Sequence, residues 1–248
     1  MDLEKLIREV AEEINKNKEV VAFTGAGISV ESGIPAFRGS QGLWEKYDPE
    51  EYAYISVFLR NPAKVWKMLR DMFSIALQAK PNTAHLVLAE MEKKGYLKAI
   101  ITQNVDGLHQ EAGSQKVIEL HGNGRFLVCL SCHNRVPFLR EHLEIEPYPV
   151  CQTCQKALKP DVVFFGEPLP EEALNSAYAL AKSCKIFLIV GTSGVVYPAA
   201  QIPYYAKSKG ATIVEVNLWE SSYTYKLTDF FLKGKAGEIF DKLSKYLF

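Results

Sequence analysis

Short runs of apolar, mostly β-branched residues alternate along this chain with segments in which apolar residues recur every three or four positions. The runs predict five strands, at Val20–Phe23, Ala99–Thr102, Val117–Leu120, Ile186–Val190 and Ile213–Val216. The helical pattern occurs at the N-terminus, through Leu3, Leu6, Ile7, Val10 and Ile14, and near Asn82–Lys94, Pro170–Lys182, Pro198–Lys209 and Lys235–Tyr246. Strands that are apolar at nearly every position are covered on both faces, and their alternation with helices predicts a parallel, doubly wound α/β sheet.

Two regions do not follow this alternation. Residues 44–79 are helical in pattern throughout, and residues 125–158 contain four of the five cysteines together with Pro147 and Pro149. We expect both regions to be insertions that form a small domain within one α/β domain, which consists of residues 1–43, 80–124 and 159–248. A chain of 248 residues is long enough for one large domain with inserted modules.

The overall charge is balanced, because the chain has 29 lysines and arginines and 29 aspartates and glutamates. A protein with no net positive field has no general attraction for nucleic acid or an anionic membrane, so we expect neither as a direct partner. No run approaches the roughly 18 apolar residues of a membrane span, and the charged, amphipathic N-terminal segment differs from a signal peptide. These features predict a cytoplasmic protein. They do not specify the oligomeric state, for which a monomer is the simplest expectation.

Four cysteines form two C-x-x-C pairs, Cys129 with Cys132 and Cys151 with Cys154, which are separated by eighteen residues. Each pair can direct two thiolates at one ion, and two pairs complete a tetrahedral zinc site of the zinc-ribbon type. Four thiolates leave no open coordination position, so the predicted Zn²⁺ is structural. A redox or disulfide role is the alternative, but it would not explain two pairs at this spacing. His133 could substitute as a ligand, although an exposed loop position is the simpler interpretation.

The stretch "GAGISV" follows the first predicted strand and contains Gly25-x-Gly27. Small residues at such a turn let the backbone approach a pyrophosphate at the start of a helix, as in dinucleotide-binding proteins. The third glycine of the usual fingerprint is absent, because Val30 stands in its position. Alone, this motif is a weak signal, since similar turns also serve only to pack a strand against a helix.

Polar residues recur at the ends of other predicted strands. In an open α/β sheet, ligands bind outside the carboxyl ends of the strands, so these residues are expected to converge with the glycine turn on one crevice. They are Gln103, Asn104, Asp106, Gly191, Thr192, Ser193 and Asn217. Each has an alternative interpretation as a turn or capping residue. His121 follows a further strand at the mouth of this crevice, where an imidazole could be a general base or could be purely structural.

Taken together, the motifs resemble those of the sirtuins, a family of NAD-dependent protein-lysine deacylases. The similarity extends in order through nearly the whole chain: "GAGIS", "ESGIPAFRG", "KPNTAH", "TQNVDGLH", "ELHGN", the two C-x-x-C pairs, "KPDVVFFGE", "GTSGVVYPA" and "GKAGE". One departure is Ala36, where the family often has an acidic residue. The resemblance implies a Rossmann-like NAD-binding domain formed by the three segments of the α/β domain, with the helical insertion and the zinc-ribbon module as its small domain.

The resemblance also implies a role for each matching residue. The residues toward NAD would be Gly25, Ala26 and Gly27 at the pyrophosphate, Phe37 and Arg38 in a mobile loop near residues 36–42 over the nicotinamide, and Gln103, Asn104 and Asp106 at the nicotinamide and its ribose. Gly191, Thr192, Ser193, Asn217, Leu218 and Ala236 would serve the phosphates and the adenosine. His121 would be the general base, with Asn104 as a second catalytic residue. Val163 and Gly166 would pair with a substrate peptide by strand addition, and Phe37, Phe165 and Val196 would line an apolar tunnel for the acyl-lysine.

The implied reaction cleaves NAD and transfers the acetyl group of an acetyl-lysine protein or peptide to ADP-ribose, which gives nicotinamide, free lysine and O-acetyl-ADP-ribose. Sirtuins that prefer acidic acyl groups have a tyrosine and an arginine at the positions of Leu69 and Met72. A neutral acyl group, acetyl or a longer apolar one, is therefore expected. Three alternatives stay open: a protein ADP-ribosyltransferase, an NAD(P) oxidoreductase with a structural zinc, and an NAD or ADP-ribose sensor. The missing third glycine counts against the oxidoreductase.

Overall fold

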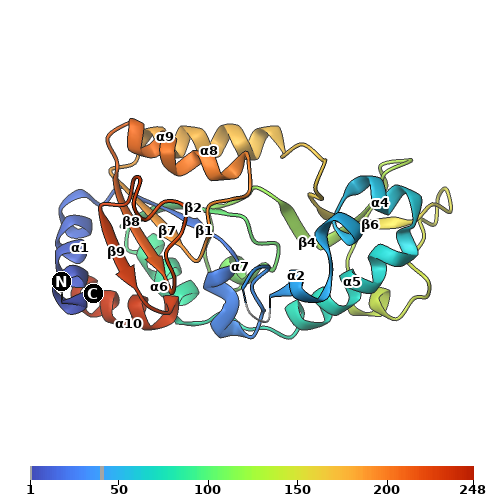
Figure 1. Ribbon diagram of the computed structural model, residues 1–248, viewed down its shortest axis with the longest axis horizontal. Helices are drawn as coiled ribbons and strands as arrows, with labels where there is room; N and C mark the ends of the chain where they lie inside the picture. The colour runs from blue at the N-terminus through green and yellow to red at the C-terminus, as the bar shows by residue number, and fades with distance from the viewer. Residues whose placement is uncertain (1, 40–41) are drawn as a thin grey trace.

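The protein has two lobes side by side, a large one that holds both termini and a smaller one at the other end of its long axis (Figure 1). The structure is a computed structural model that describes residues 2–39 and 42–248. Ser40 and Gln41, which belong to the mobile loop expected near residues 36–42, lie outside the described residues. Within the described chain, no helix is both long and apolar enough to cross a membrane.

The large lobe is built on a six-stranded sheet in which all strands are parallel. Its order is β3-β2-β1-β7-β8-β9. The strands are β1 (Val20–Thr24), β2 (Leu97–Thr102), β3 (Val117–Glu119), β7 (Ile186–Val190), β8 (Thr212–Asn217) and β9 (Phe230–Lys233). Counted within this sheet alone, the order is 3-2-1-4-5-6, which is the Rossmann order with its switch point between β1 and β7. The predicted doubly wound α/β sheet is confirmed, with β9 as an additional edge strand.

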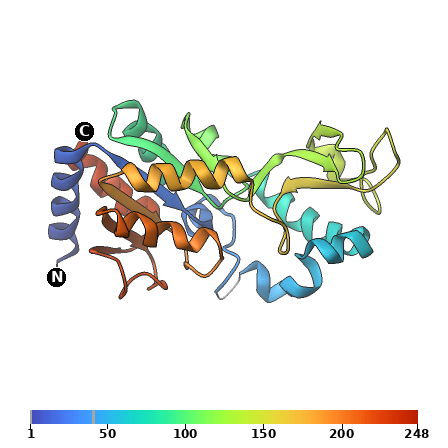
Figure 2. The ribbon, with the colours of Figure 1, turned by 90° about the horizontal axis from the view of Figure 1, so that it is seen from above.

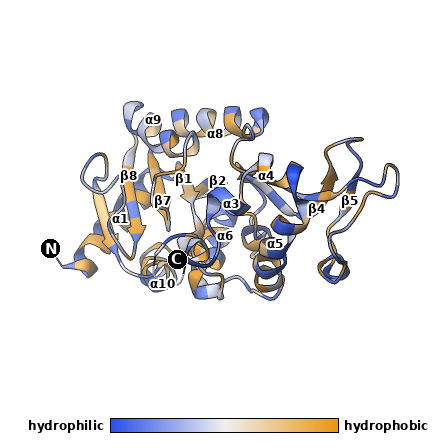
Figure 3. Ribbon diagram, turned by 45° about the vertical axis from the view of Figure 1, so that its right-hand side comes forward, coloured by the Kyte–Doolittle hydropathy of each residue, from blue (hydrophilic) through white to orange (hydrophobic). Residues whose placement is uncertain are grey.

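Helices cover both faces of the large sheet, because successive side chains of each strand point to opposite faces. On β1, Val20 and Ala22 pack toward one hydrophobic cluster, whereas Val21 and Phe23 pack toward another. The first face is covered by α1 (Leu3–Asn17), α6 (Thr83–Lys93) and α10 (Ala236–Leu247), and the second by α8 (Glu171–Ser183) and α9 (Ile202–Ser208). Figure 2 shows α8 and α9 lying over the strands. The strands are mostly hydrophobic, whereas hydrophilic residues occupy the outer sides of the helices (Figure 3).

The small lobe combines the two regions that interrupt the strand–helix alternation, and its sheet also includes residues 122–124 and 159–162, which the sequence assigned to the α/β domain. Its helices are α2 (Leu43–Lys46), α3 (Pro49–Tyr52), α4 (Ile55–Arg60) and α5 (Pro62–Ala76), and its antiparallel sheet has the order β5-β4-β6. These strands are β4 (Gly122–Cys129), β5 (Arg135–Pro137) and β6 (Leu158–Val162), with the short helix η2 (Arg140–Leu143) after β5.

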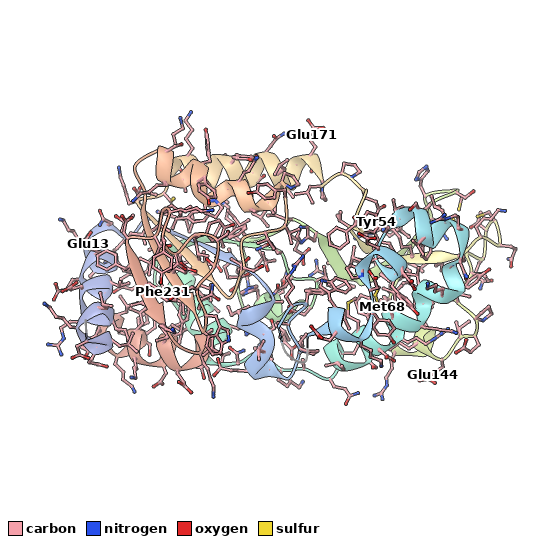
Figure 4. All side chains as sticks on the ribbon, in the orientation of Figure 1. Glu13, Tyr54, Met68, Glu144, Glu171 and Phe231 are labelled. Carbon is pink, nitrogen blue, oxygen red and sulfur yellow. The ribbon has the colours of Figure 1, made fainter. Side chains whose placement is uncertain are left out.

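One hydrophobic core joins the helices and the sheet of the small lobe. Trp66 of α5 is fully buried, packs edge-on against Phe138, and donates a hydrogen bond from Nε1 to the Leu158 carbonyl at 2.9 Å. Met68, on the same helix, is buried in this core (Figure 4). The helical region and the cysteine-rich region therefore depend on each other for burial of their apolar residues.

Candidate active site

Four loops meet at the carboxyl ends of the central strands, next to the switch point of the sheet. After β1 comes the 3₁₀ helix η1 (Ala26–Ser32), and after β2 comes the segment Gln103–Gly107, followed by α7 (Leu108–Glu111). The other two loops follow β7 and β8 and begin at Gly191 and Leu218. Rossmann-like sheets bind their ligands at this place. The structure thus brings the strand-end residues that the sequence singled out to one edge of the sheet.

Three glycines interlock where the loops after β1 and β7 meet. The Gly27 N–H donates to the Gly191 carbonyl at 2.8 Å, and a Cβ on Gly27 would lie only 2.7 Å from Gly191 Cα. On Gly25 a Cβ would lie 2.8 Å from Thr192 Cβ. Gly191 has a positive φ of 63°. The backbones of the two loops therefore touch, and only glycine permits this approach.

The missing third glycine has a simple structural reason. Val30 lies in η1 with 48% of its surface exposed, so no neighbouring backbone approaches its Cβ closely enough to require glycine. The usual fingerprint needs its third glycine for close packing of a helix against a strand. Here the chain after Gly27 forms a short 3₁₀ helix instead of entering a long α-helix.

A buried polar network connects η1 with the loop after β2. The Ser29 hydroxyl donates to Asp106 Oδ2 at 2.7 Å, and Asn104 Nδ2 donates to the Gly25 carbonyl at 3.2 Å and to Ser29 Oγ at 3.3 Å. The Leu108 N–H donates to the other oxygen of Asp106 at 3.0 Å. Burial raises the pKa of the Asp106 carboxyl, and these two hydrogen bonds oppose that effect. Both loops are thereby held in one geometry.

His121 follows β3 and is oriented by a backbone contact. Its Nδ1 lies 2.9 Å from the Gln103 carbonyl oxygen. A carbonyl only accepts, so Nδ1 carries the proton and Nε2 carries the free electron pair of the neutral ring. Burial lowers the pKa of His121, and the contact with the Gln103 carbonyl partly opposes this effect. The side chain is therefore a neutral base at physiological pH. Gln103 itself donates to Thr192 Oγ1 at 3.1 Å.

An apolar cavity adjoins this polar network and extends to α5 of the small lobe. Its lining combines Ala26, Ser29, Ile34, Pro35, Phe37, Leu43, Met72, Phe73, Ile75, Ala76, Asn104, Val105 and Asp106. Three predicted NAD residues near the nicotinamide, Phe37, Asn104 and Asp106, thus share one cavity with Ala26 of the glycine turn. Arg38 does not line it and is exposed. Ser29 and Val105 are site residues to which sequence reasoning gave no role, although both lie inside the motifs that were recognised.

The predicted adenosine-side residues spread over three loops. Asn217, at the end of β8, donates from Nδ2 to the Thr192 carbonyl at 2.9 Å and to the fully buried Glu215 carboxylate at 3.1 Å. Ser193 and Leu218 are exposed beside it. Ala236 is buried at the start of α10, where the next N–H, of Gly237, donates to a Glu31 oxygen at 2.6 Å.

The predicted substrate-binding segment runs from the end of β6 to Glu167. Val163 N–H donates to the carbonyl of His121 at 2.9 Å, so the segment is tied directly to the candidate base. Phe165 exchanges two backbone hydrogen bonds with the small lobe, to the Ala53 carbonyl and from the Ile55 N–H, both at 3.0 Å. Gly166 has a φ of 87°. Val196 is half-buried in the loop after β7.

Aromatic side chains connect the small lobe with the cavity. The rings of Phe37 and Trp44 have centroids 5.1 Å apart, and Trp44 lies 6.3 Å from Phe165. Tyr54, on the other side of Phe165, has its ring centroid 5.4 Å away. Phe37 and Phe165, the two aromatic residues predicted for an acyl-lysine tunnel, thus belong to one aromatic cluster, in which Trp44 was not anticipated.

Two other histidines are buried behind the site. His85 Nδ1 accepts from the Asn82 N–H at 3.3 Å and so completes the capping of α6. His109 lies 2.9 Å from Thr24 Oγ1 through Nε2. Desolvation lowers the pKa of His85 to about 4 and that of His109 to about 3. Both rings are neutral packing and capping residues, as their sequence positions indicate.

The four cysteines of the C-x-x-C pairs converge at the end of the small lobe. Their sulfur atoms all lie within 4.8 Å of one another, and Cys129 Sγ and Cys154 Sγ are 3.4 Å apart. A tetrahedral site with Zn–S bonds of about 2.3 Å places its sulfurs roughly 3.8 Å apart, so these residues fit Zn²⁺.

The two cysteine pairs have the same backbone geometry. The His133 N–H donates to the Cys129 carbonyl, and the Gln155 N–H donates to the Cys151 carbonyl, both at 2.9 Å. His133 and Gln155, which each follow the second cysteine of a pair, have positive φ values of 60° and 58°. Backbone N–H groups of Cys154 and Thr153 point at the Cys151 sulfur and lower the pKa of its thiol to about 6. The repeated turn presents thiolates from two directions. His133 is exposed and lies outside the cluster.

Comparisons with known proteins give a consistent result. A model of the Sir2 family matches residues 25–198. An NAD-dependent protein deacylase of Pyrococcus furiosus is 51% identical over 243 residues, which cover 96% of each chain. A solved Sir2 enzyme has a TM-score of 0.90 at 47% identity and covers 98% of both chains. A Sir2 complex with a deacetylated p53 peptide and 3′-O-acetyl-ADP-ribose has a TM-score of 0.92 at 37% identity, with 96% of this chain and 97% of that chain covered.

Proposed function

The chain belongs to the Sir2 family, and on this premise we propose that it is an NAD-dependent protein-lysine deacetylase. The observation that carries the proposal is the His121 imidazole, whose Nδ1–H is held by the Gln103 carbonyl beside the Asn104–Ser29–Asp106 network. This arrangement supplies a neutral base next to an apolar cavity at the switch point of a Rossmann-like sheet.

We propose that NAD lies across the carboxyl ends of β1 and β7. Its pyrophosphate would lie over Gly25, Ala26 and Gly27, and its nicotinamide would enter the apolar cavity, with Asn104 and Asp106 at the nicotinamide ribose. Gln103, Phe37 and Arg38 would contribute at that end. The remaining residues, Gly191, Thr192, Ser193, Asn217, Leu218 and Ala236, would surround the phosphates and the adenosine.

The first chemical step breaks the bond between nicotinamide and the ribose. The nicotinamide of NAD is already a cationic leaving group, so the acetyl oxygen of acetyl-lysine can displace it when the two are held in line. The apolar walls of the cavity exclude water, which at this carbon would only hydrolyse NAD. The step forms a C–O bond between the ribose and the acetyl group and releases neutral nicotinamide.

His121 acts in the second step. Its Nε2 removes a proton from the ribose diol, and the ribose oxygen attacks the imidate carbon formed from the acetyl-lysine. Addition of water and departure of the lysine amine give free lysine and O-acetyl-ADP-ribose. The Gln103 carbonyl stabilises the imidazolium that forms, because it continues to accept the Nδ1–H.

The substrate would be a protein or peptide that carries acetyl-lysine. The structure of a related Sir2 protein with a deacetylated p53 peptide supports this substrate class. We propose that the peptide backbone adds to the segment with Val163 and Gly166, and that the acyl-lysine passes Phe37, Phe165 and Val196. The cysteine cluster would hold a structural zinc ion. The cytoplasmic location expected from the sequence stays a prediction.

The decisive experiment incubates the purified protein with NAD and a panel of acyl-lysine peptides and identifies the products by mass. Deacetylation predicts equimolar nicotinamide, deacetylated peptide and O-acetyl-ADP-ribose. Transfer of ADP-ribose to the peptide would instead indicate a protein ADP-ribosyltransferase, and reduction of NAD an oxidoreductase. Tight NAD binding without turnover would indicate a sensor, and the deacetylase proposal would then be wrong.

A further inference from the structure

Lys159 of β6 and Glu167 of the loop that follows β6 form an ion pair that is largely shielded from water. The Lys159 side chain is 4% exposed and that of Glu167 is 21% exposed, and Lys159 Nζ lies 2.8 Å from Glu167 Oε2. The other ion pairs of the small lobe lie nearer its surface; Arg135 and Asp161, for example, are 47% and 38% exposed. Removing a lysine ammonium from water is costly unless its hydrogen bonds are replaced. A role in keeping the protein surface soluble therefore does not account for the Lys159–Glu167 pair.

Both charged groups hold the backbone of the same short segment. Lys159 Nζ also donates to the Val162 carbonyl at 2.6 Å, and its ammonium lies 4.5 Å from the centroid of the Phe164 ring. Glu167 Oε2 accepts from the Phe164 N–H at 2.8 Å, while the Glu167 N–H donates to the Phe164 carbonyl at 3.0 Å. The pair thus closes residues 162–167 into a fixed loop from the inside.

The outer contacts of that loop reach the two other parts of the site. Val163 is bonded to the His121 carbonyl, and Phe165 is bonded to the small lobe through Ala53 and Ile55. A displacement of the loop would therefore move the proposed peptide-binding backbone relative to the base. Positional errors of about 1 Å are enough to reduce a reaction rate strongly.

From these contacts we propose that Lys159 and Glu167 are positioning residues, which hold the segment Val163–Gly166 in the geometry that receives the acyl-lysine peptide. This inference rests on the proposed function, because it assigns the segment to peptide binding. The two residues do not contact the reacting atoms. They act through the backbone of Val162 and Phe164, and the ion pair contributes geometry more than stability.

The test replaces both charges at once, so that no unpaired charge stays buried. The variant Lys159→Met/Glu167→Gln keeps the stem of the lysine and an acceptor for the Phe164 N–H. The matched control is Arg135→Met/Asp161→Asn, which removes a more exposed ion pair of the same lobe whose side chains hydrogen-bond to each other and not to the loop or to His121. Zinc content and thermal unfolding establish that both variants are folded. If the double variant does not fold, Glu167→Gln alone is measured, since it retains the acceptor.

We expect KM for an acetyl-lysine peptide to rise by about 10-fold in the Lys159/Glu167 variant, with the Kd for NAD unchanged and kcat reduced less. Amide hydrogen exchange at Phe164 and Phe165 should accelerate in the same variant without any ligand. The control should show neither change. An unaltered peptide KM, or equal losses in NAD and peptide binding, would overturn the inference. Absence of turnover in the parent protein would instead refute the proposed function. Amide hydrogen exchange needs no turnover, so it would still show whether the ion pair fixes the loop.

Discussion

The Nδ1 atom of His121 lies 2.9 Å from the carbonyl oxygen of Gln103, two residues brought together from the ends of neighbouring strands β2 and β3. This contact decides which ring nitrogen is the base. The carbonyl has no proton to give, so the neutral ring keeps its proton on Nδ1 and accepts a new one at Nε2. Gln103 begins the loop that is proposed to contact the nicotinamide, and its backbone carbonyl also sets the tautomer of His121, the proposed general base.

The pH dependence of turnover should reflect the burial of this ring. Burial lowers the pKa of His121 from its ordinary value of 6.5, so the ring stays neutral and active to a lower pH than an exposed histidine would. As the pH falls through the lowered pKa, His121 is protonated and kcat/KM should decline tenfold per pH unit. Measurement of kcat/KM for an acetyl-peptide between pH 5 and 8 tests this. An acid limb centred above 6.5 would contradict it, and the exposed-site variant His133→Asn should leave the profile unchanged.

Removal of the imidazole should separate binding from chemistry. For His121→Ala we expect deacetylation to fall by about 10²–10⁴-fold, the usual contribution of a positioned general base. The first step, displacement of nicotinamide by the acetyl oxygen, does not need this base, so exchange of labelled nicotinamide into NAD in the presence of acetyl-peptide should persist. Parent-level deacetylation by the variant would show that another group is the base. His133→Asn is the control, because that side chain is exposed and asparagine tolerates the positive φ of this position.

The interlocked glycines predict a selective loss of NAD affinity. In Gly27→Ala the new Cβ would lie 2.7 Å from Gly191 Cα, so one of the two loops must move. We expect about 1–3 kcal/mol of destabilisation from the overpacking and at least about tenfold weaker NAD binding by calorimetry. Gly210→Ala is the control: its φ of 89° makes it strained as well, but the space around it is open. It should lose about 1 kcal/mol of stability and retain NAD affinity.

Most strands that the sequence predicted are buried on both faces and have uninterrupted apolar runs, whereas the predicted edge strand β3 is half-buried. The strands that it did not predict have other burial patterns. β9 is a four-residue edge strand with only Leu232 buried, and β4 alternates buried with half-buried residues except at the exposed Arg125. In β5 and β6, Pro137 and Pro160 weaken any strand signal. These missed elements are formed by tertiary packing more than by local sequence.

The placement of the candidate site residues was predictable where chain topology alone fixes it. Gln103, Gly191 and Asn217 follow parallel strands, so they must meet at one edge of the sheet. The roles of Ser29 and Lys159 were not predictable in this way. Ser29 joins the candidate site through its hydrogen bonds with Asn104 and Asp106, and Lys159 through its burial beside Glu167. Such contacts depend on how loops and side chains that are separate in sequence pack together, which periodicity does not report.

Zinc should be required for the small lobe to fold. Cys151→Ser, or exhaustive chelation, should remove the metal and lower the thermal unfolding temperature, because binding energy at a structural site is folding energy. The loss should extend to peptide turnover, since the helices of this lobe share one core with the cysteine-bearing sheet. Cys184→Ala is the control: this buried thiol lies outside the cluster, so zinc content should not change. An unchanged unfolding temperature after complete zinc loss would rule out a structural role.

The apolar lining of the cavity predicts a preference for neutral acyl groups. Leu69 is fully buried and Met72 lines the cavity, while the nearby Arg70 guanidinium donates to the carbonyls of Leu143, Ile145 and Pro147. A succinyl carboxylate would therefore be desolvated without a partner, and we expect kcat/KM for acetyl-lysine to exceed that for succinyl-lysine by at least about 100-fold. In Met72→Arg this ratio should fall by about tenfold, because the new cation can pair with the carboxylate.

The matched control for that substitution is Ser74→Arg, which adds an arginine to an exposed position of the same helix. It should leave the acetyl-to-succinyl ratio at the parent value, since Ser74 does not line the cavity. Equal kcat/KM values of the parent protein for the two acyl groups would refute the predicted preference. A cation inside the cavity acts at short range, whereas one on the helix surface is screened by solvent. An equal fall of the ratio in both arginine variants would therefore show that the added net charge, and not the position of Met72, causes the effect.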